Sequence, residues 1–107
     1  MARRRKFVLV FAPETVQHMD AIETKYHSLI ERTIDEQLEY TPERATRNRK
    51  LLGEPGPFDA TWELRFGPQN RFRVFYDVDA TAWETHVLAI GVKERETLFI
   101  GGKEYTP

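Results

Sequence analysis

Arginine side chains gather in two neighbouring segments of this 107-residue sequence. Arg65 lies in a run of alternating apolar and polar residues, and Arg71 and Arg73 lie in the run that follows it. A guanidinium stays charged in proteins and offers a planar fork of N–H donors, which matches the oxygens of a phosphate group. Cations held in one place can bind a phosphodiester and stabilise the charge that develops when it is cleaved. These arginines are therefore the first candidates for chemistry.

Other residue types that commonly carry catalysis are absent or scattered. The sequence has no cysteine, which excludes a disulfide framework, a thiolate metal site and a cysteine nucleophile. The histidines His18, His27 and His86 show neither metal-ligand spacing nor the pattern of a triad. We expect His18 to be an exposed helical residue. His86, on one face with Leu88 and Ile90, is expected to be a partly buried sheet residue. The sequence predicts no metal and no cofactor.

Composition indicates one ordinary domain over residues 1–107. Hydrophobic residues make up 40% and charged residues 31%, which is enough for one modest core. The net charge is -1, from 16 Lys and Arg against 17 Asp and Glu, and this sum alone does not support a polyanionic partner. No apolar run approaches the roughly 20 residues that cross a bilayer. The apolar stretch after the basic start is too short for a signal peptide. We expect a cytoplasmic protein with no membrane partner.

The N-terminal part predicts one strand and two helices. Residues 6–12 (KFVLVFA) contain a β-branched and aromatic run after Lys6 that is typical of a buried strand. Apolar residues at helical spacing then indicate helices over 14–26 and 28–40. Ser28 and Glu31 have the spacing of a capping box, which would open the second helix. One long bent helix is the alternative to this helical hairpin.

The C-terminal part predicts an antiparallel meander. It follows a connection over 41–60 that is rich in proline and glycine and carries little regular structure. The expected strands are 61–66, 71–78, 84–92 and a short last strand over 97–100. This order indicates an α+β fold. An N-terminal strand and a helical hairpin precede a meander of three to four strands, and the helices pack on one face.

Side-chain alternation predicts the pairing of the first two meander strands. When both apolar faces lie on the same side, the register pairs Phe66 with Phe72, Leu64 with Val74, and Trp62 with Tyr76. The same register places Arg65 directly opposite Arg73, where two like charges destabilise a sheet. The pair forms an anion site, or Glu63 and Asp77 relieve it. The sequence leaves both readings open.

Charge is separated along the chain. The predicted helical hairpin has seven carboxylates against Lys25 and Arg32. The basic residues lie elsewhere: Arg3 to Lys6 at the start, Arg44, Arg47, Arg49 and Lys50 in the long connection, Arg65, Arg71 and Arg73 on the sheet, and Lys93 and Arg95 at its end. Because the helices cover one face of the sheet, the opposite face is predicted to be cationic, as in a protein that binds a phosphate backbone. A solvated polar face is the alternative.

Several segments together carry a resemblance to a known family. They are 46–50 (TRNRK), 62–65 (WELR), 72–78 (FRVFYDV), 87–93 (VLAIGVK) and 98–103 (LFIGGK). In combination they resemble the RelE/ParE superfamily, the toxins of type II toxin–antitoxin modules. The resemblance covers nearly the whole chain from Phe7 onwards. The family fold, a helical hairpin against an antiparallel sheet, matches the order of elements predicted above.

The resemblance implies two different activities. RelE-like members cut mRNA in the ribosomal A site by attack of a ribose 2′-OH on the adjacent phosphate, and they inhibit translation. They use basic side chains, with no metal and no histidine base. ParE-like members instead inhibit DNA gyrase. A cognate antitoxin silences both. The leading expectation is a ribosome-dependent mRNA endoribonuclease, or mRNA interferase. The alternative is a gyrase inhibitor or a catalytically weakened antitoxin-binding protein.

The resemblance also implies roles for single residues. Arg73 falls on the family's sheet arginine, which contacts the scissile phosphate. Arg65 would support it from the neighbouring strand, and Lys93 falls where RelE-like nucleases carry another arginine. The residues expected to contact the RNA backbone are Arg47, Arg49, Lys50, Arg71 and Arg95.

The sequence departs from the nuclease pattern at two places. Glu63 or Trp62 stands where RelE-like nucleases have lysines in the first meander strand. Phe99 stands where they use a tyrosine, and Tyr105 is close in sequence but not aligned with that position. A phenylalanine cannot transfer a proton, and a carboxylate repels phosphate. Both departures favour the alternative without nuclease activity.

Overall fold

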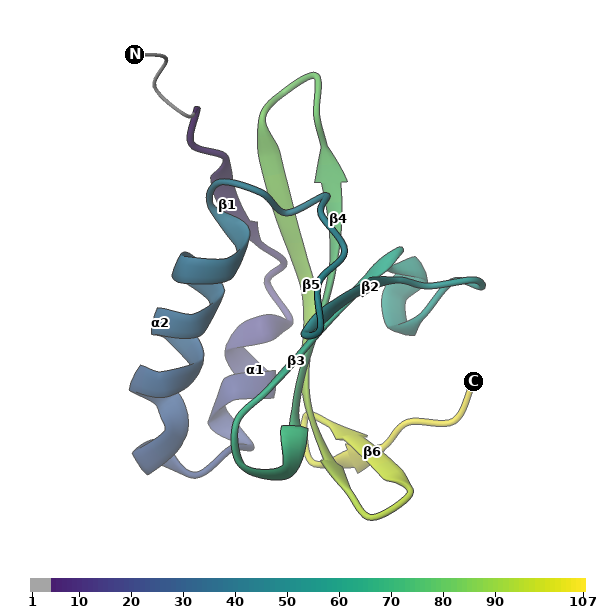
Figure 1. Ribbon diagram of the computed structural model, residues 1–107. Helices are drawn as coiled ribbons and strands as arrows, with labels where there is room; N and C mark the ends of the chain where they lie inside the picture. Colours follow the sequence, from purple (N-terminus) through teal and green to yellow (C-terminus); the bar gives the residue numbers. More distant parts are fainter. Residues whose placement is uncertain (1–4) are drawn as a thin grey trace.

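The computed structural model describes residues 5–107, so that Arg3 and Arg4 of the basic start lie outside the described residues. Over this range the fold is α+β, with two α-helices on one side of a seven-stranded sheet (Figure 1). The helices are α1 (Thr15–Asp20) and α2 (His27–Leu38), with 3-10 turns η1 (Thr24–Tyr26), η2 (Pro57–Asp59) and η3 (Pro68–Asn70). The strands are β1 (Val8–Phe11), β2 (Arg49–Leu51), β3 (Trp62–Phe66), β4 (Phe72–Asp79), β5 (Glu84–Glu94), β6 (Thr97–Ile100) and β7 (Lys103–Glu104).

The sheet is an antiparallel path in the order β2-β3-β4-β5-β6-β7. Strand β1 is the exception, because it runs parallel to the first half of β5. The predicted meander strands are confirmed. Strand β2 is a correction, since the connection over 41–60 was expected to carry little regular structure. A strand of three residues is too short for an alternation pattern to reveal it.

The predicted register of β3 against β4 is confirmed at every pair, including Arg65 opposite Arg73. The prediction that His86 shares a face with Leu88 and Ile90 is wrong. The pairing of β4 with β5 shifts between Phe75 and Tyr76, which leaves Leu88 as an extra residue on β5. Because of this bulge, Val87 rather than His86 lies with Ile90 in the main core. His86 is partly buried, as expected, and its Nε2 lies 3.0 Å from a carboxylate oxygen of Glu84.

The main core lies between α2 and the sheet. Ile30, Ile34 and Leu38 have at most 1% of their surface exposed and face an apolar layer contributed by β3, β4 and β5. Tyr76 is fully buried in this layer, and its hydroxyl donates a 2.9 Å hydrogen bond to the carbonyl of Pro42. The phenolate would be desolvated there, so burial raises the pKa of Tyr76. This core positions the strands that carry the charged face.

The two-helix prediction is confirmed, but with shorter helices. Helix α1 ends at Asp20 and gives way to η1 before α2 begins at His27. The expected capping box does not form, because no side chain caps α2. Nε2 of His27 lies 2.8 Å from the carbonyl oxygen of Ile22 instead. Strand β1 is an edge strand rather than a buried one, and Val8 is 61% exposed. It pairs with β5 alone.

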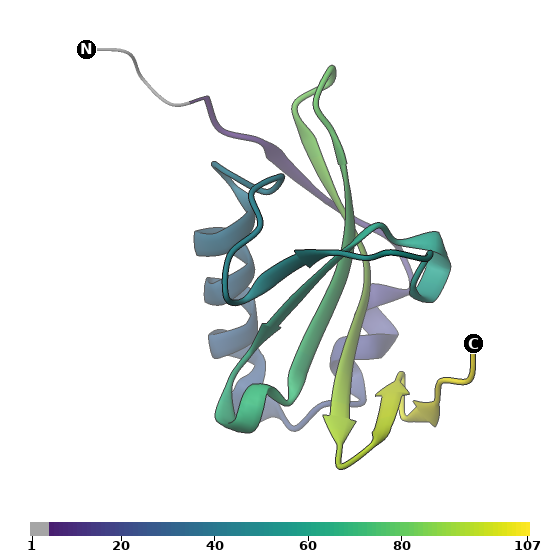
Figure 2. The same cartoon turned by 45° about the vertical axis from the view of Figure 1, so that its right-hand side comes forward.

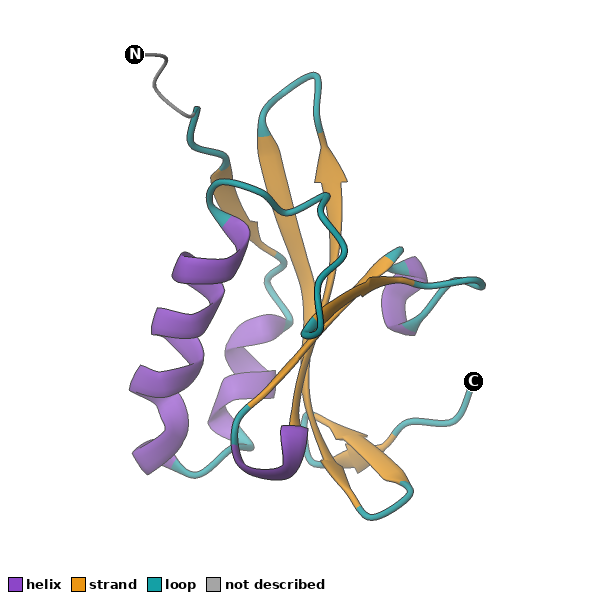
Figure 3. Ribbon diagram, in the orientation of Figure 1, coloured by secondary structure: helices purple, strands orange, loops and turns teal. Residues whose placement is uncertain are grey.

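The far side of the sheet is different in character. Turn η2 and the C-terminal segment lie there, on the side of the sheet away from α2 (Figure 3). A view turned by 45° shows β6 folding back from the end of β5 and the C-terminus lying near η2 (Figure 2). The sheet therefore has a helix-covered face and a face framed by a turn and the tail.

Candidate functional site

A cleft of about 340 Å³ lies on the face of the sheet that the helices leave open. The charged residues that line it come from five strands and from the turn after β5: Lys50, Glu63, Arg65, Arg73, Lys93, Glu96 and Glu104. Strand alternation brings Arg65 and Arg73 to this face because their neighbours Leu64, Phe66 and Val74 point into the core. The structure thus gathers the three residues Arg65, Arg73 and Lys93 in one cleft.

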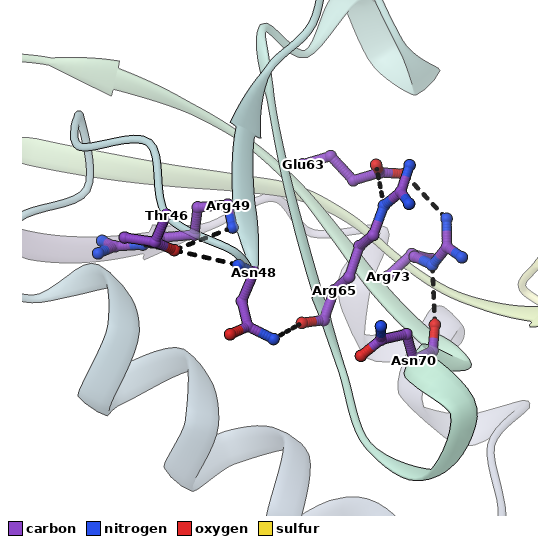
Figure 4. Close-up of polar contacts among 7 residues, drawn as sticks. All are labelled: Thr46, Asn48, Arg49, Glu63, Arg65, Asn70 and Arg73. Carbon is purple, nitrogen blue, oxygen red and sulfur yellow. Dashed lines mark hydrogen bonds and ion pairs between the residues drawn. The ribbon is translucent and has the colours of Figure 1, made fainter.

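Glu63 lies between the two arginines (Figure 4). Nε of Arg65 donates to Oε1 of Glu63 at 2.8 Å, and Nη1 of Arg73 donates to Oε2 at 3.4 Å. The Glu63 side chain is only 8% exposed, and that of Arg73 only 11%. Charges this far from water need partners, so one carboxylate stabilises two guanidinium groups that would otherwise repel each other.

The register left open whether Glu63 and Asp77 relieve the repulsion between Arg65 and Arg73. Glu63 relieves the facing arginines, whereas Asp77 does not take part. The carboxylate of Asp77 instead accepts hydrogen bonds from the backbone N–H and the hydroxyl of Thr61, at 2.8 and 2.7 Å. One carboxylate against two guanidinium groups leaves the cluster of Arg65, Glu63 and Arg73 with one positive charge.

Donors remain for an anion. Within residues 5–107, Arg65 uses only its Nε in a hydrogen bond, and its side chain is 36% exposed, so its two terminal nitrogens remain as donors. Arg73 is more fully engaged, because its Nε also donates to the carbonyl of Asn70 at 2.9 Å. Lys50 is exposed on β2, and Lys93 is partly buried on β5. The cleft can therefore bind a singly charged phosphodiester with Arg65 as its most accessible fork.

Tyr105 is the residue of the cleft that sequence reasoning did not place. Phe99 lines a different pocket, with Ile22 and Ile90 of the helix side. Gly101 and Gly102 have φ values of +63° and +79° and reverse the chain between β6 and β7. The backbone N–H of Tyr105 then donates to the carbonyl of Leu98 at 2.8 Å, and its side chain lines the cleft. The paired glycines are the available sequence signal, because such a pair favours a tight hairpin.

Arg49 is a correction to the expected RNA-binding set. It is 6% exposed, and its Nη1 donates to the carbonyls of Gln37, at 2.8 Å, and of Thr41. These are carbonyls at and just beyond the C-terminal end of α2, which the helix itself leaves without partners. Desolvation lowers the pKa of the Arg49 guanidinium. Arg49 therefore links β2 to the end of α2 through hydrogen bonds, and its side chain is too buried to contact a nucleic acid.

The other expected RNA-binding residues are dispersed. Lys50 lines the cleft. Arg71 does not, because it follows η3 in a helical backbone conformation, and its guanidinium lies over the ring of Tyr26 at 5.5 Å. It also lies 3.6 Å from a carboxylate oxygen of Glu94. Arg47 and Arg95 are exposed and lie outside the lining of the cleft.

Within residues 5–107, no group of three or more His, Asp and Glu could hold a metal ion. In the same range, no helix is long and apolar enough to cross a membrane. No family model, no curated protein and no solved structure matches this chain. The case for a function therefore depends on the cleft and on the sequence resemblance.

Proposed function

We propose that this protein is the toxin of a type II toxin–antitoxin module, and that its cleft binds the phosphodiester backbone of mRNA on the ribosome. The observation that carries this proposal is the gathering of Arg65, Arg73 and Lys93 from three strands around one opening. The resemblance to RelE/ParE toxins supports it, and so does the order of strand, helices and meander. Such a toxin acts in the cytoplasm and is silenced by a cognate antitoxin.

The proposed reaction needs charge stabilisation rather than a metal. The 2′-oxygen of one ribose forms a bond to phosphorus, and the bond to the 5′-oxygen of the next nucleotide breaks. The 2′-OH gives its proton to water, and the leaving 5′-oxygen takes up a proton from water, so that a 2′,3′-cyclic phosphate and a 5′-hydroxyl are formed. Negative charge grows on the phosphate oxygens during this step. Arg65 and Arg73 would stabilise that charge. Lys93 would stabilise the leaving 5′-oxygen, and Tyr105, which lines the same cleft, would orient the ribose.

A second function is favoured by one specific contact. Glu63 bonds to both arginines at the centre of the cleft and takes up donors that a scissile phosphate would need. A carboxylate in that position suits a protein that binds without cutting. The alternative function is a gyrase inhibitor or an antitoxin-binding protein without nuclease activity.

The test is controlled expression in bacteria of the wild type, Arg73→Ala and Arg73→Lys, with Arg32→Ala as the matched control at a 66% exposed position on α2. We expect the wild type and Arg32→Ala to stop growth. Arg73→Ala should be harmless, and Arg73→Lys should be weakened because a point charge replaces a fork. Circular dichroism of the purified variants shows whether each is folded. Equal growth with all four proteins would contradict the toxin assignment.

Two readouts after induction separate the nuclease from its alternative. Mapping of mRNA 5′ ends detects cleavage at ribosome-bound codons, and plasmid topology detects loss of gyrase supercoiling. New mRNA ends that vanish in Arg73→Ala support the nuclease. Relaxed plasmids with intact mRNA support the gyrase inhibitor.

A further inference from the structure

A second pocket, of about 450 Å³, adjoins the cleft. The two share Tyr105 and Glu104, so that the tail residue Tyr105 borders both. The other walls come from the start of α1, from η2 and from the turn between β6 and β7. A chain bound in the cleft therefore lies next to this second space.

Phe58 gives the pocket an exposed aromatic wall. Its side chain is 51% exposed, although a phenylalanine is usually buried. Its backbone is left-handed, with φ 57° and ψ 32°, and the next residue, Asp59, also has a positive φ of 62°. Non-glycine residues rarely adopt this conformation, and strain of this kind clusters at binding sites. The turn η2 therefore keeps an aromatic ring exposed to solvent, and its backbone conformation is unfavourable for the two non-glycine residues.

His18 gives the pocket a fixed donor, and its position corrects the expectation of an exposed helical residue. It is 6% exposed, and its ring lies 5.7 Å from that of Phe58 between centroids. Its Nδ1 accepts a 3.3 Å hydrogen bond from the backbone N–H of Ile90. Desolvation lowers the pKa of His18 more than Glu14 raises it, so the neutral ring carries its proton on Nε2. Within residues 5–107, every fully buried side-chain nitrogen has a hydrogen-bond partner. Because Nε2 of His18 has none there, it is accessible to solvent, and His18 lines two pockets.

The charges of this pocket differ from those of the cleft. Glu14 and Glu104 contribute two carboxylates, and Lys103 contributes one cation. A phosphate would be repelled here, whereas a carboxylate readily accepts a hydrogen bond from the amino group of a base. Gln17 adds an amide that can both donate and accept. The lining suits a flat, uncharged ring with hydrogen-bonding edges.

We propose that this pocket is a nucleobase subsite. When the cleft holds a phosphodiester at Arg65 and Arg73, a base of an adjacent nucleotide turns past Tyr105 and stacks on Phe58. The side chains of the α1 segment contact the edge of that base. This inference rests on the proposed function for the identity of the ligand as single-stranded RNA, and it assigns a role to η2 and α1 that the cleft alone does not give them.

Binding of two oligonucleotides to the full chain tests the subsite. The first is a fluorescein-labelled 2′-O-methyl RNA octamer, which cannot be cut by 2′-OH attack. The second has the same length and charge but abasic residues. Phe58→Leu keeps an apolar side chain and removes the aromatic face. Phe11→Leu is the matched control, because Phe11 is 46% exposed and lines a pocket between α1 and α2 instead.

We expect Phe58→Leu to weaken binding of the octamer about tenfold, which is within the range for loss of one stacked base. The same variant should bind the abasic strand as the wild type does, and Phe11→Leu should bind both strands as the wild type does. Equal octamer binding by Phe58→Leu and wild type would overturn the subsite. So would an equal loss on both strands.

The outcome is separable from the toxin assignment. If the wild type binds the octamer through Phe58 but does not inhibit growth, the subsite stands and the toxin proposal fails. If the wild type inhibits growth and Phe58→Leu binds normally, the subsite fails alone. If the wild type binds neither strand, both the cleft and the subsite are wrong as nucleic-acid sites.

Discussion

The two faces of the sheet consist of alternate residues of the same strands, yet one face buries apolar side chains and the other holds charged ones. On the helix side, Leu64, Val74 and Ile90 are at most 2% exposed and pack among other apolar side chains. On the open side, Arg65 and Arg73 face each other, and the carboxylate of Glu63 accepts a hydrogen bond from each. The helix side gains free energy from burial, and this gain keeps a register that is unfavourable for the charges on the other side.

The comparison teaches how a protein can hold like charges together. The shared carboxylate of Glu63 reduces the electrostatic repulsion between the two arginines. Each buried leucine or phenylalanine contributes about 1.5–3 kcal/mol to the stability of the fold. The core can therefore impose a charged arrangement that the strands alone would not choose. This contrast between the two faces can be tested by four measurements.

The largest effect is expected in the apolar layer. Phe72 is fully buried and packs against the rings of Tyr26 and Phe66. Phe72→Ala should lower the free energy of unfolding by about 3–5 kcal/mol, through lost burial and the cavity that remains. Urea denaturation measures this loss. Val16→Ala, at a position that is 65% exposed, is the control and should change stability little. A loss below about 1 kcal/mol for Phe72→Ala would mean that the helix side does not dominate.

The second effect separates a structural arginine from surface ones. Arg49→Ala leaves the carbonyls of Gln37 and Thr41 without their buried donor, so the free energy of unfolding should fall by about 2–4 kcal/mol. Arg47→Ala removes an exposed arginine two residues away and should cost less than about 0.5 kcal/mol. Parallel urea titrations compare the two. Equal stabilities would show that Arg49 is not held as described.

The third prediction concerns the open side. Glu63→Gln removes the negative charge between Arg65 and Arg73, so binding of a 2′-O-methyl RNA octamer should become several-fold tighter at low salt. Its free energy of unfolding should fall by about 1–3 kcal/mol because the arginines lose their shared partner. Glu96→Gln changes the same charge in the cleft lining without touching either arginine, and it should have the smaller effect on both. Weaker RNA binding by Glu63→Gln would make Glu63 a positioning residue.

The smallest effect is a dependence of stability on pH. Because the pKa of His18 is lowered below its ordinary 6.5 in the folded protein, the unfolded chain binds the proton more readily. The contribution of neutral His18 is complete above pH 6.5 and is lost as the pH falls from there through the folded pKa. The stability advantage of the wild type over His18→Gln should therefore shrink between pH 7.5 and 5. Parallel curves for the two proteins across that range would contradict it.

Much of the sheet was predictable from the residues, because its signals are local. The alternation of β3 and β4 predicts their pairing residue by residue, and that pairing alone brings Arg65 opposite Arg73. Helix α2 follows from its apolar stripe of Ile30, Ile34 and Leu38. The unformed capping box shows the limit of such rules, since a short motif competes with the tertiary contacts of its own residues.

Local patterns in the sequence were enough to predict the α+β order and the register of the charged strands. The uneven distribution of acidic and basic residues along the chain is likewise a property of the sequence. The tertiary structure determines which of the basic side chains can contact a ligand. Arg49 and Arg71 have the same residue type as Arg65, but one is buried against the end of α2 and the other lies over Tyr26. One turn brings Tyr105 to the cleft, and another brings Phe58 to the second pocket. Such outcomes depend on contacts between distant segments, which no local pattern of residues records.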